Sequence, residues 1–131
     1  MRSTNYTNFD SIEDGSATVV YQTKAPMAKA FTFGGRVDGS ALGGMSFSAG
    51  DYNLASGYSS VALGSQTKAR SSCSFAEGDY TDAAGAAAHA EGASTIAQGI
   101  SSHSEGYGTK ALGEYSHAEG YMTKASSSAT T

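Results

Sequence analysis

The three histidines of this chain have the spacing of a repeated chemical motif. Each stands two residues before a glutamate, and the pairs recur every fourteen residues: His89/Glu91, His103/Glu105 and His117/Glu119. Imidazole and carboxylate can transfer protons, hold a metal ion or satisfy each other as hydrogen-bond partners. Acid–base catalysis needs a singular, perturbed site in a cleft, and a regular column is the opposite of that. We therefore expect no enzymatic activity and no catalytic residue.

The spacing of the histidines belongs to a seven-residue repeat. Eleven of the seventeen glycines keep this period, which is interrupted once, at Ser71. Ala or Ser stands two residues before each of these positions, and Ser or Thr usually stands four residues before it. The glycines in step are Gly43, Gly50, Gly57, Gly64, Gly78, Gly85, Gly92, Gly99, Gly106, Gly113 and Gly120. A short period held this long indicates a repeat architecture.

The repeat predicts strands and not a coiled coil. A heptad coil needs large apolar side chains at two positions, whereas the constant residues here are the smallest ones, and each glycine weakens a helix by about 1 kcal/mol. Five strand residues followed by two corner residues put Ser/Thr, Ala and Gly on one face, which must lie close to a second unit. Two units form a fourteen-residue coil, so the chain between about Ser40 and Ala125 should make some six coils. The two-residue corners need unusual backbone angles beside them, and glycine is tolerated there without strain.

The motif also carries a family resemblance. Ser116-His-Ala-Glu-Gly120 recurs as Ser74-Phe-Ala-Glu-Gly78, Ala88-His-Ala-Glu-Gly92 and Ser102-His-Ser-Glu-Gly106. These phrases resemble the head repeats of YadA-type trimeric autotransporter adhesins, and more closely the SHAEG-type repeats of bacteriophage fibre proteins. The resemblance covers about two thirds of the chain. It implies an all-β fold, a left-handed parallel β-roll that assembles as a homotrimer.

The outward positions indicate which strand contacts the other subunits. A core of alanine methyls recovers too little free energy to order a coil alone, so outward side chains must be buried as well. One alternate set of units carries the large apolar residues and all three histidines, and the other carries Lys68, Arg70, Lys110 and Lys124. We expect the second set to face mostly water. The predicted trimer interface is Phe47, Val61, Leu63, Phe75, His89, Glu91, His103, Glu105, His117 and Glu119.

At such an interface the His–Glu column is expected to be an inter-subunit hydrogen-bond network. The alternative is a set of rings in which three copies of His89, of His103 or of His117 hold a metal or an anion on the axis. We expect no cofactor. The Ser/Thr rows point inward with Ala and Gly, so their hydroxyls should bond within the roll, which argues against ice binding.

Composition excludes several classes of protein. The formal net charge of −4 argues against a basic nucleic-acid-binding surface. No apolar run has membrane-spanning length, so no membrane insertion is expected, and the start Met1–Tyr6 is not a secretory signal. A single cysteine, Cys73, excludes an intrachain disulfide; it falls at a predicted corner and is expected to be a free thiol, the alternative being a cross-link between copies.

Six tyrosines fall in the predicted corners, and Tyr107 and Tyr121 are one coil apart on the same edge. Such rings can cover a corner and stack on each other, or they can offer an edge that contacts a glycan. The sequence leaves both possibilities open.

The rest of the chain differs in kind. Residues 1–38 should be an N-terminal anchor or cap, with strands over 17–22 and 30–33, Phe31 and Phe33 over the first coil, and a turn at Gly34-Gly35. The β-roll would occupy 39–125 and a tail 126–131. The resemblance to phage fibre repeats implies a bacteriophage tail or head fibre, a virion protein that we expect to be anchored to other virion proteins by its N terminus and to support attachment to a host-surface glycan or protein. The alternative is the head fragment of a bacterial trimeric adhesin on the cell surface.

Overall fold

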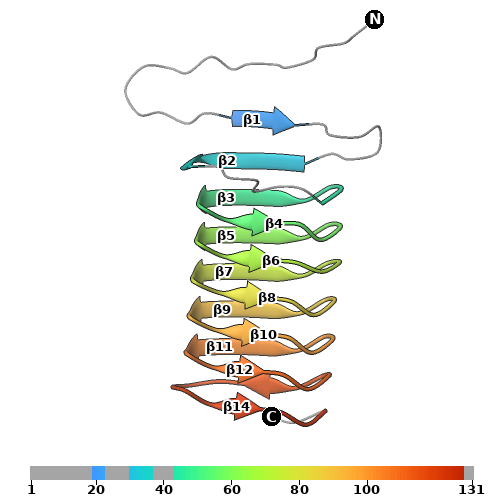
Figure 1. Cartoon of the computed structure of the whole chain (residues 1–131), viewed down its shortest axis with the longest axis vertical. Coiled ribbons are helices and arrows are strands. Elements are labelled where there is room, and N and C mark those ends of the chain that lie inside the picture. Colours follow the sequence, from blue (N-terminus) through green and yellow to red (C-terminus); the bar gives the residue numbers. More distant parts are fainter. Residues whose placement is uncertain (1–18, 23–29, 37–42, 129–131) are drawn as a thin grey trace, which may run out of the picture.

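The chain winds into a parallel β-solenoid of about six turns with about fourteen residues per turn, as the sequence predicts (Figure 1). The structure is a computed structural model that describes residues 19–22, 30–36 and 43–128. Two sheets run along the solenoid, one of eight strands and one of six, and successive coils stack through parallel ladders. The period of the sequence is therefore the half-turn of the coil.

The eight-stranded sheet contains the longer strands. It has the order β1-β2-β3-β5-β7-β9-β11-β13, and only its first pair is antiparallel. Its strands are β1 Val19–Gln22, β2 Ala30–Arg36, β3 Phe47–Asp51, β5 Val61–Ser65, β7 Phe75–Asp79, β9 His89–Ala93, β11 His103–Tyr107 and β13 His117–Ala118.

The six-stranded sheet is built from strands of two residues each. They are β4 Leu54–Ala55, β6 Lys68–Ala69, β8 Asp82–Ala83, β10 Ile96–Ala97, β12 Lys110–Ala111 and β14 Lys124–Ala125. Figure 1 shows these short strands alternating with the long ones down the rod.

The expectation of two equal five-residue strands per coil is wrong. At the end of most short strands one carbonyl accepts two successive N–H groups: Ala97 O bonds to Ala84 N at 2.8 Å and to Gly85 N at 3.2 Å. The same fork occurs at Ala69, Ala111 and Ala125. A forked acceptor breaks the regular alternation of a ladder, so the strand cannot continue past it.

The core consists of the small residues that the repeat places inward. Buried alanines line both sheets, and no apolar residue larger than alanine is buried within 43–128. They are Ala55, Ala62, Ala69, Ala76, Ala83, Ala88, Ala90, Ala97, Ala111, Ala118 and Ala125. The space between the sheets therefore holds little more than methyl and hydroxyl groups.

Inward serines lock one corner of each coil. Ser46, Ser60, Ser102 and Ser116 each donate a hydrogen bond from Oγ to the carbonyl three residues earlier, at 2.6–2.7 Å. Ala88 occupies the same position in its coil and lacks the hydroxyl. The expectation that inward hydroxyls bond within the roll is confirmed for these serines.

The threonine row on the opposite corner is less uniform. Thr109 Oγ1 bonds to Ser104 Oγ at 2.7 Å, and Thr67 Oγ1 donates to Asn53 Oδ1 at 2.9 Å. Thr81 Oγ1 and Thr95 Oγ1, however, are buried without a partner. For these two residues the expectation is wrong; both have alanine five residues earlier, where Thr109 has Ser104.

The residue that turns the chain at each corner has a left-handed backbone conformation, and in most corners it is not glycine. The second corner residue has a positive φ of 53–58° wherever it is not glycine, as at Tyr52, Cys73 and Ser94. Only Gly108, with φ 67°, puts glycine there. The unusual backbone angles expected beside the corners occur at the glycines of the long-strand units, while the turning residue itself is left-handed without being glycine in all but one corner.

The periodic glycines are required for two other reasons. In the long-strand units glycine has a positive φ of 99–123°, outside the range that other residues favour, and Gly92 is one example. In the short-strand units, as at Gly99, a Cβ would collide with the carbonyl of the next coil. Ser71 takes this second kind of position with an altered ladder: its N–H is bonded to Ser74 Oγ at 3.2 Å, and its Oγ donates to Ala84 O at 2.6 Å.

The first coil is extended by the two N-terminal strands. β2 pairs in parallel with β3, and β1 pairs antiparallel with β2, so β2 continues the long-strand ladder. Gly34 and Gly35 lie within β2, at a register shift between Phe33 and Arg36, and not in the expected turn. Most of the predicted anchor, 1–18, 23–29 and 37–38, and the end of the tail, 129–131, lie outside the described residues. Within the described ranges no helix is long and apolar enough to cross a membrane.

Candidate functional site

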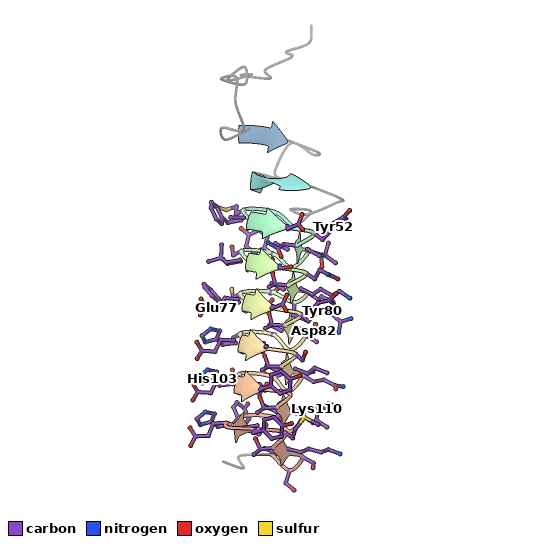
Figure 2. All side chains as sticks on the ribbon, turned by 90° about the vertical axis from the view of Figure 1, so that its left-hand side faces the viewer. Tyr52, Glu77, Tyr80, Asp82, His103 and Lys110 are labelled. Atoms are coloured by element: carbon purple, nitrogen blue, oxygen red, sulfur yellow. The ribbon has the colours of Figure 1, made fainter. Side chains whose placement is uncertain are left out.

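All three histidines project outward from the long-strand sheet in one line. Parallel register places His89 beside His103 and His103 beside His117, while Glu77, Glu91 and Glu105 form a second line two residues along. We call the His–Glu column the set Glu77, His89, Glu91, His103, Glu105, His117 and Glu119. Figure 2 shows Glu77 and His103 projecting from one side of the rod, away from Tyr80, Asp82 and Lys110.

The imidazole rings of the column form a continuous stack. The centroids of His89 and His103 are 4.8 Å apart and those of His103 and His117 are 4.9 Å apart, with 2° between the planes in both pairs. The spacing is that of neighbouring strands in a sheet. The backbone ladder therefore sets the distance between the rings.

Each histidine is bonded to the glutamate of the preceding coil. Nε2 of His89, His103 and His117 lies 3.2, 3.0 and 3.2 Å from Oε1 of Glu77, Glu91 and Glu105. The glutamate two residues after a histidine in sequence is thus the partner of the next histidine. Mutual satisfaction of imidazole and carboxylate was expected, but it occurs between coils of a single chain.

This offset brings in a residue that the sequence analysis missed. Glu77 follows Phe75 rather than a histidine, so it was not assigned to the column, yet it bonds to His89. Its place in the recurring phrase Ser74-Phe-Ala-Glu-Gly78 was the available signal. Glu119, which was assigned, is largely exposed and lies 3.8 Å from His117 at its Oε2.

The pKa of one carboxylate in the column, that of Glu105, is shifted. The hydrogen bond from His117 lowers the pKa of Glu105 below its ordinary value, with further lowering from the neighbouring His103 and from Glu91, while partial desolvation opposes the shift. The column therefore favours the ionised form of Glu105.

Apolar side chains continue the same line toward the first coil. Phe47, Val61, Phe75 and His89 are register partners in turn, and Phe75 packs edge-on against His89 with ring centroids 5.0 Å apart. Leu63 lies beside Glu77 in the neighbouring line. All five of these apolar and imidazole side chains are half-buried in one chain. We call Phe47, Val61, Leu63 and Phe75 together with the His–Glu column the outer ribbon.

The short-strand sheet presents a different surface. Lys68, Arg70, Lys110 and Lys124 are exposed there, and Arg70 forms an ion pair of 2.7 Å with Asp82. A shallow hollow of about 490 Å³ lies on this side of the rod. It is lined by Tyr52, Gln66, Lys68, Tyr80, Thr81, Asp82, Ser94, Ile96 and Lys110.

The tyrosines and the cysteine stand at corners, as the sequence predicts. Tyr107 and Tyr121 stack with ring centroids 5.4 Å apart and 7° between the planes, and their exposed fractions are 52% and 75%. The rings therefore do cover each other, and whether they also contact a glycan stays a prediction. Cys73 is an exposed free thiol at a left-handed corner.

Comparison with protein-family models, with curated proteins and with solved structures finds no match.

Proposed function

We propose that this protein is a structural fibre or spike component of a bacteriophage virion, a trimeric rod that supports attachment to the host surface. The proposal takes the rod to be anchored through residues 1–38 and wound with a left hand. The recurring Ser-His-Ala-Glu-Gly phrase, which resembles phage fibre repeats, is the motif-level support for it.

One observation carries the proposal. Between 43 and 128 every large apolar side chain points outward, and no apolar residue larger than alanine is buried in the core. Burying the outer ribbon against two other copies would supply the apolar contact that the narrow core lacks. A closed threefold assembly around this ribbon would give a stiff rod with the lysine-bearing sheets outside.

Stiffness follows from the parallel ladders along the rod. Each described coil from 43 to 125 bonds to the next through both sheets, as in Phe75 N to Ala88 O and Asp82 N to Thr95 O, both at 2.9 Å. Bending such a rod would break ladder bonds in several strands together. This is a mechanical property that suits a projecting fibre.

The decisive experiment is immunogold labelling of purified virions with an antibody raised against residues 43–128. We expect label at regular positions on tail or capsid, and none on virions of a phage lacking this gene. Label on the surface of uninfected bacteria would support instead the alternative, the head of a trimeric adhesin. Absence of label from both the virions and the bacterial surface would overturn the virion proposal.

The host contact can be tested with the same protein. The Tyr107–Tyr121 pair offers exposed aromatic surface suited to stacking on a sugar. If it is the receptor edge, Tyr107→Ala with Tyr121→Ala should abolish binding of the purified rod to host cells, whereas Tyr58→Ala, an exposed corner tyrosine elsewhere, should not. If the double variant, the Tyr58→Ala variant and the unaltered rod all bind equally, the Tyr107–Tyr121 edge is not the receptor contact.

A further inference from the structure

We infer that the His–Glu column contains a binding site for a divalent transition-metal ion of the zinc class, formed within one chain by consecutive coils. Two groups of ligands meet the requirement: His89 with Glu91 and His103, and His103 with Glu105 and His117. In each group one ligand atom from every residue lies within 4.8 Å of the others. His103 belongs to both groups.

The ligand types suit this class of ion. Imidazole nitrogen and carboxylate oxygen are ordinary zinc ligands, and three protein ligands leave a fourth position for water. Hard cations such as Mg²⁺ and Ca²⁺ prefer oxygen alone, so a set with two imidazoles selects against them.

The geometry is close to what a tetrahedral ion needs. Two ligand atoms, each about 2.1 Å from such an ion, lie about 3.4 Å apart. The existing nitrogen–oxygen distances of 3.0 Å for His103–Glu91 and 3.2 Å for His117–Glu105 are already near this value. An ion entering either group would replace the proton that these two atoms now share.

The third ligand must move to complete the site. The imidazole rings are parallel and stacked, whereas the nitrogen lone pair lies in the ring plane, so one ring has to turn out of the stack. In a single chain the side chains of His89, His103 and His117 are about one third exposed, which leaves room for this rotation before the copies associate. Because two sites share His103, we expect one ion per chain.

The test is calorimetric titration of Zn²⁺ into chelator-treated, untagged protein, with Co²⁺ absorption as a report on tetrahedral geometry. His103→Gln removes a ligand from both groups and should weaken binding at least tenfold, on the order seen when metal sites lose a supporting residue. His89→Gln and His117→Gln each leave one complete group, so each should still bind one ion per chain.

Two controls separate this site from its competitors. Glu114→Gln removes an exposed corner carboxylate that belongs to neither group, and Cys73→Ser removes an exposed thiol that can itself bind zinc. Both should bind as the unaltered protein does. If the ion were instead held by rings of three imidazoles on a trimer axis, His103→Gln would remove only one of the three rings.

Several outcomes would overturn the inference. These are no zinc binding at micromolar concentrations, unchanged binding in His103→Gln, or complete loss in Cys73→Ser. Circular dichroism of every variant should show the same β signal, so that loss of the ion is not mistaken for loss of the fold. The ligands come from one chain, so failure here would leave the proposed virion role untouched.

Discussion

The narrow interior makes single atoms matter at positions that look interchangeable in the sequence. Gly92 and Gly108 are both glycines with positive φ, but their surroundings differ. A Cβ on Gly92 would collide with the backbone carbonyl of Gly106, whereas a Cβ on Gly108 would meet only the movable end of Met122. Backbone of the next coil cannot yield without breaking the ladder. An exposed methionine side chain can.

We expect Gly92→Ala to lower the free energy of unfolding by at least about 2 kcal/mol, because strain and overpacking add. Gly108→Ala should cost about 1 kcal/mol or less, since other residues occupy the same left-handed position in the remaining corners. Chemical unfolding followed by circular dichroism at one fixed protein concentration measures both. Equal stability of the two variants would contradict this account of the glycines.

The serine corner offers a gain in stability. Ala88 is buried where five other coils place a serine whose hydroxyl bonds to the carbonyl three residues earlier. Ala88→Ser should add the missing bond to Gly85 O and raise the free energy of unfolding by about 1 kcal/mol. Ser102→Ala, its mirror change, should lower that free energy by a similar amount. A stabilised Ser102→Ala would show that the hydroxyl is not needed at this corner.

Strands and their ladders convert local spacing into columns of like side chains. Register alone brings His89, His103 and His117 into one stack, and it places carboxylates beside them at the same repeat. Rows of like charge repel one another. The alternation of imidazole with carboxylate relieves this repulsion, and the lowered pKa of Glu105 is its electrostatic signature.

The lowered pKa predicts how the solenoid responds to acid. A carboxyl whose pKa is lower in the folded state than in the unfolded chain stabilises the fold above its ordinary value of 4.5, and this stabilisation is lost as the pH falls through the folded pKa. Glu105→Gln should therefore flatten the loss of thermal stability below about pH 4.5.

The matched control is Glu114→Gln, an exposed corner carboxylate. Melting temperatures between pH 3 and 6, measured at low and at high salt, make the test, because salt screens a partly exposed pair. If the melting temperature falls at low pH as steeply in Glu105→Gln as in the unaltered protein, this carboxylate contributes no pH dependence.

At the scale of the whole molecule, the outer ribbon is the surface that we expect other copies of the chain to cover. A solenoid whose interior holds only small residues has its large apolar surface outside, so association is the expected way to bury it. The two faces of the rod differ enough to say where copies should meet. Apart from the exposed Glu119, the outer ribbon is half-buried already and carries apolar and paired polar groups, whereas the short-strand face carries exposed lysines.

Two leucines provide a matched test of the assembly. Leu63 belongs to the outer ribbon and Leu112 to the short-strand side, and both are half-buried in one chain. Leu63→Gln should shift sedimentation from trimer toward monomer or loss of fold, while Leu112→Gln should leave the trimer intact. A protein that is monomeric and folded at high dilution before any substitution would overturn the trimer proposal.

The repeat by itself determined the all-β fold, the length of the coil and the identity of the inward residues. These features depend only on the alternation of side chains along a strand, which is local. The column of histidines also followed from counting, because stacking two units per coil superposes every fourteenth residue.

Only the tertiary structure decided the contacts between coils. It paired each histidine with the glutamate of the preceding coil, brought in Glu77, and limited the short strands to two residues, four of them at forked carbonyls. It also put positive φ on corner residues such as Tyr52 and Cys73 as well as on about half of the periodic glycines, and allowed Ser71 to replace a glycine by redirecting its N–H. These outcomes depend on how far a side chain reaches and on which backbone atom the next coil presents. Neither quantity is contained in the spacing of one unit.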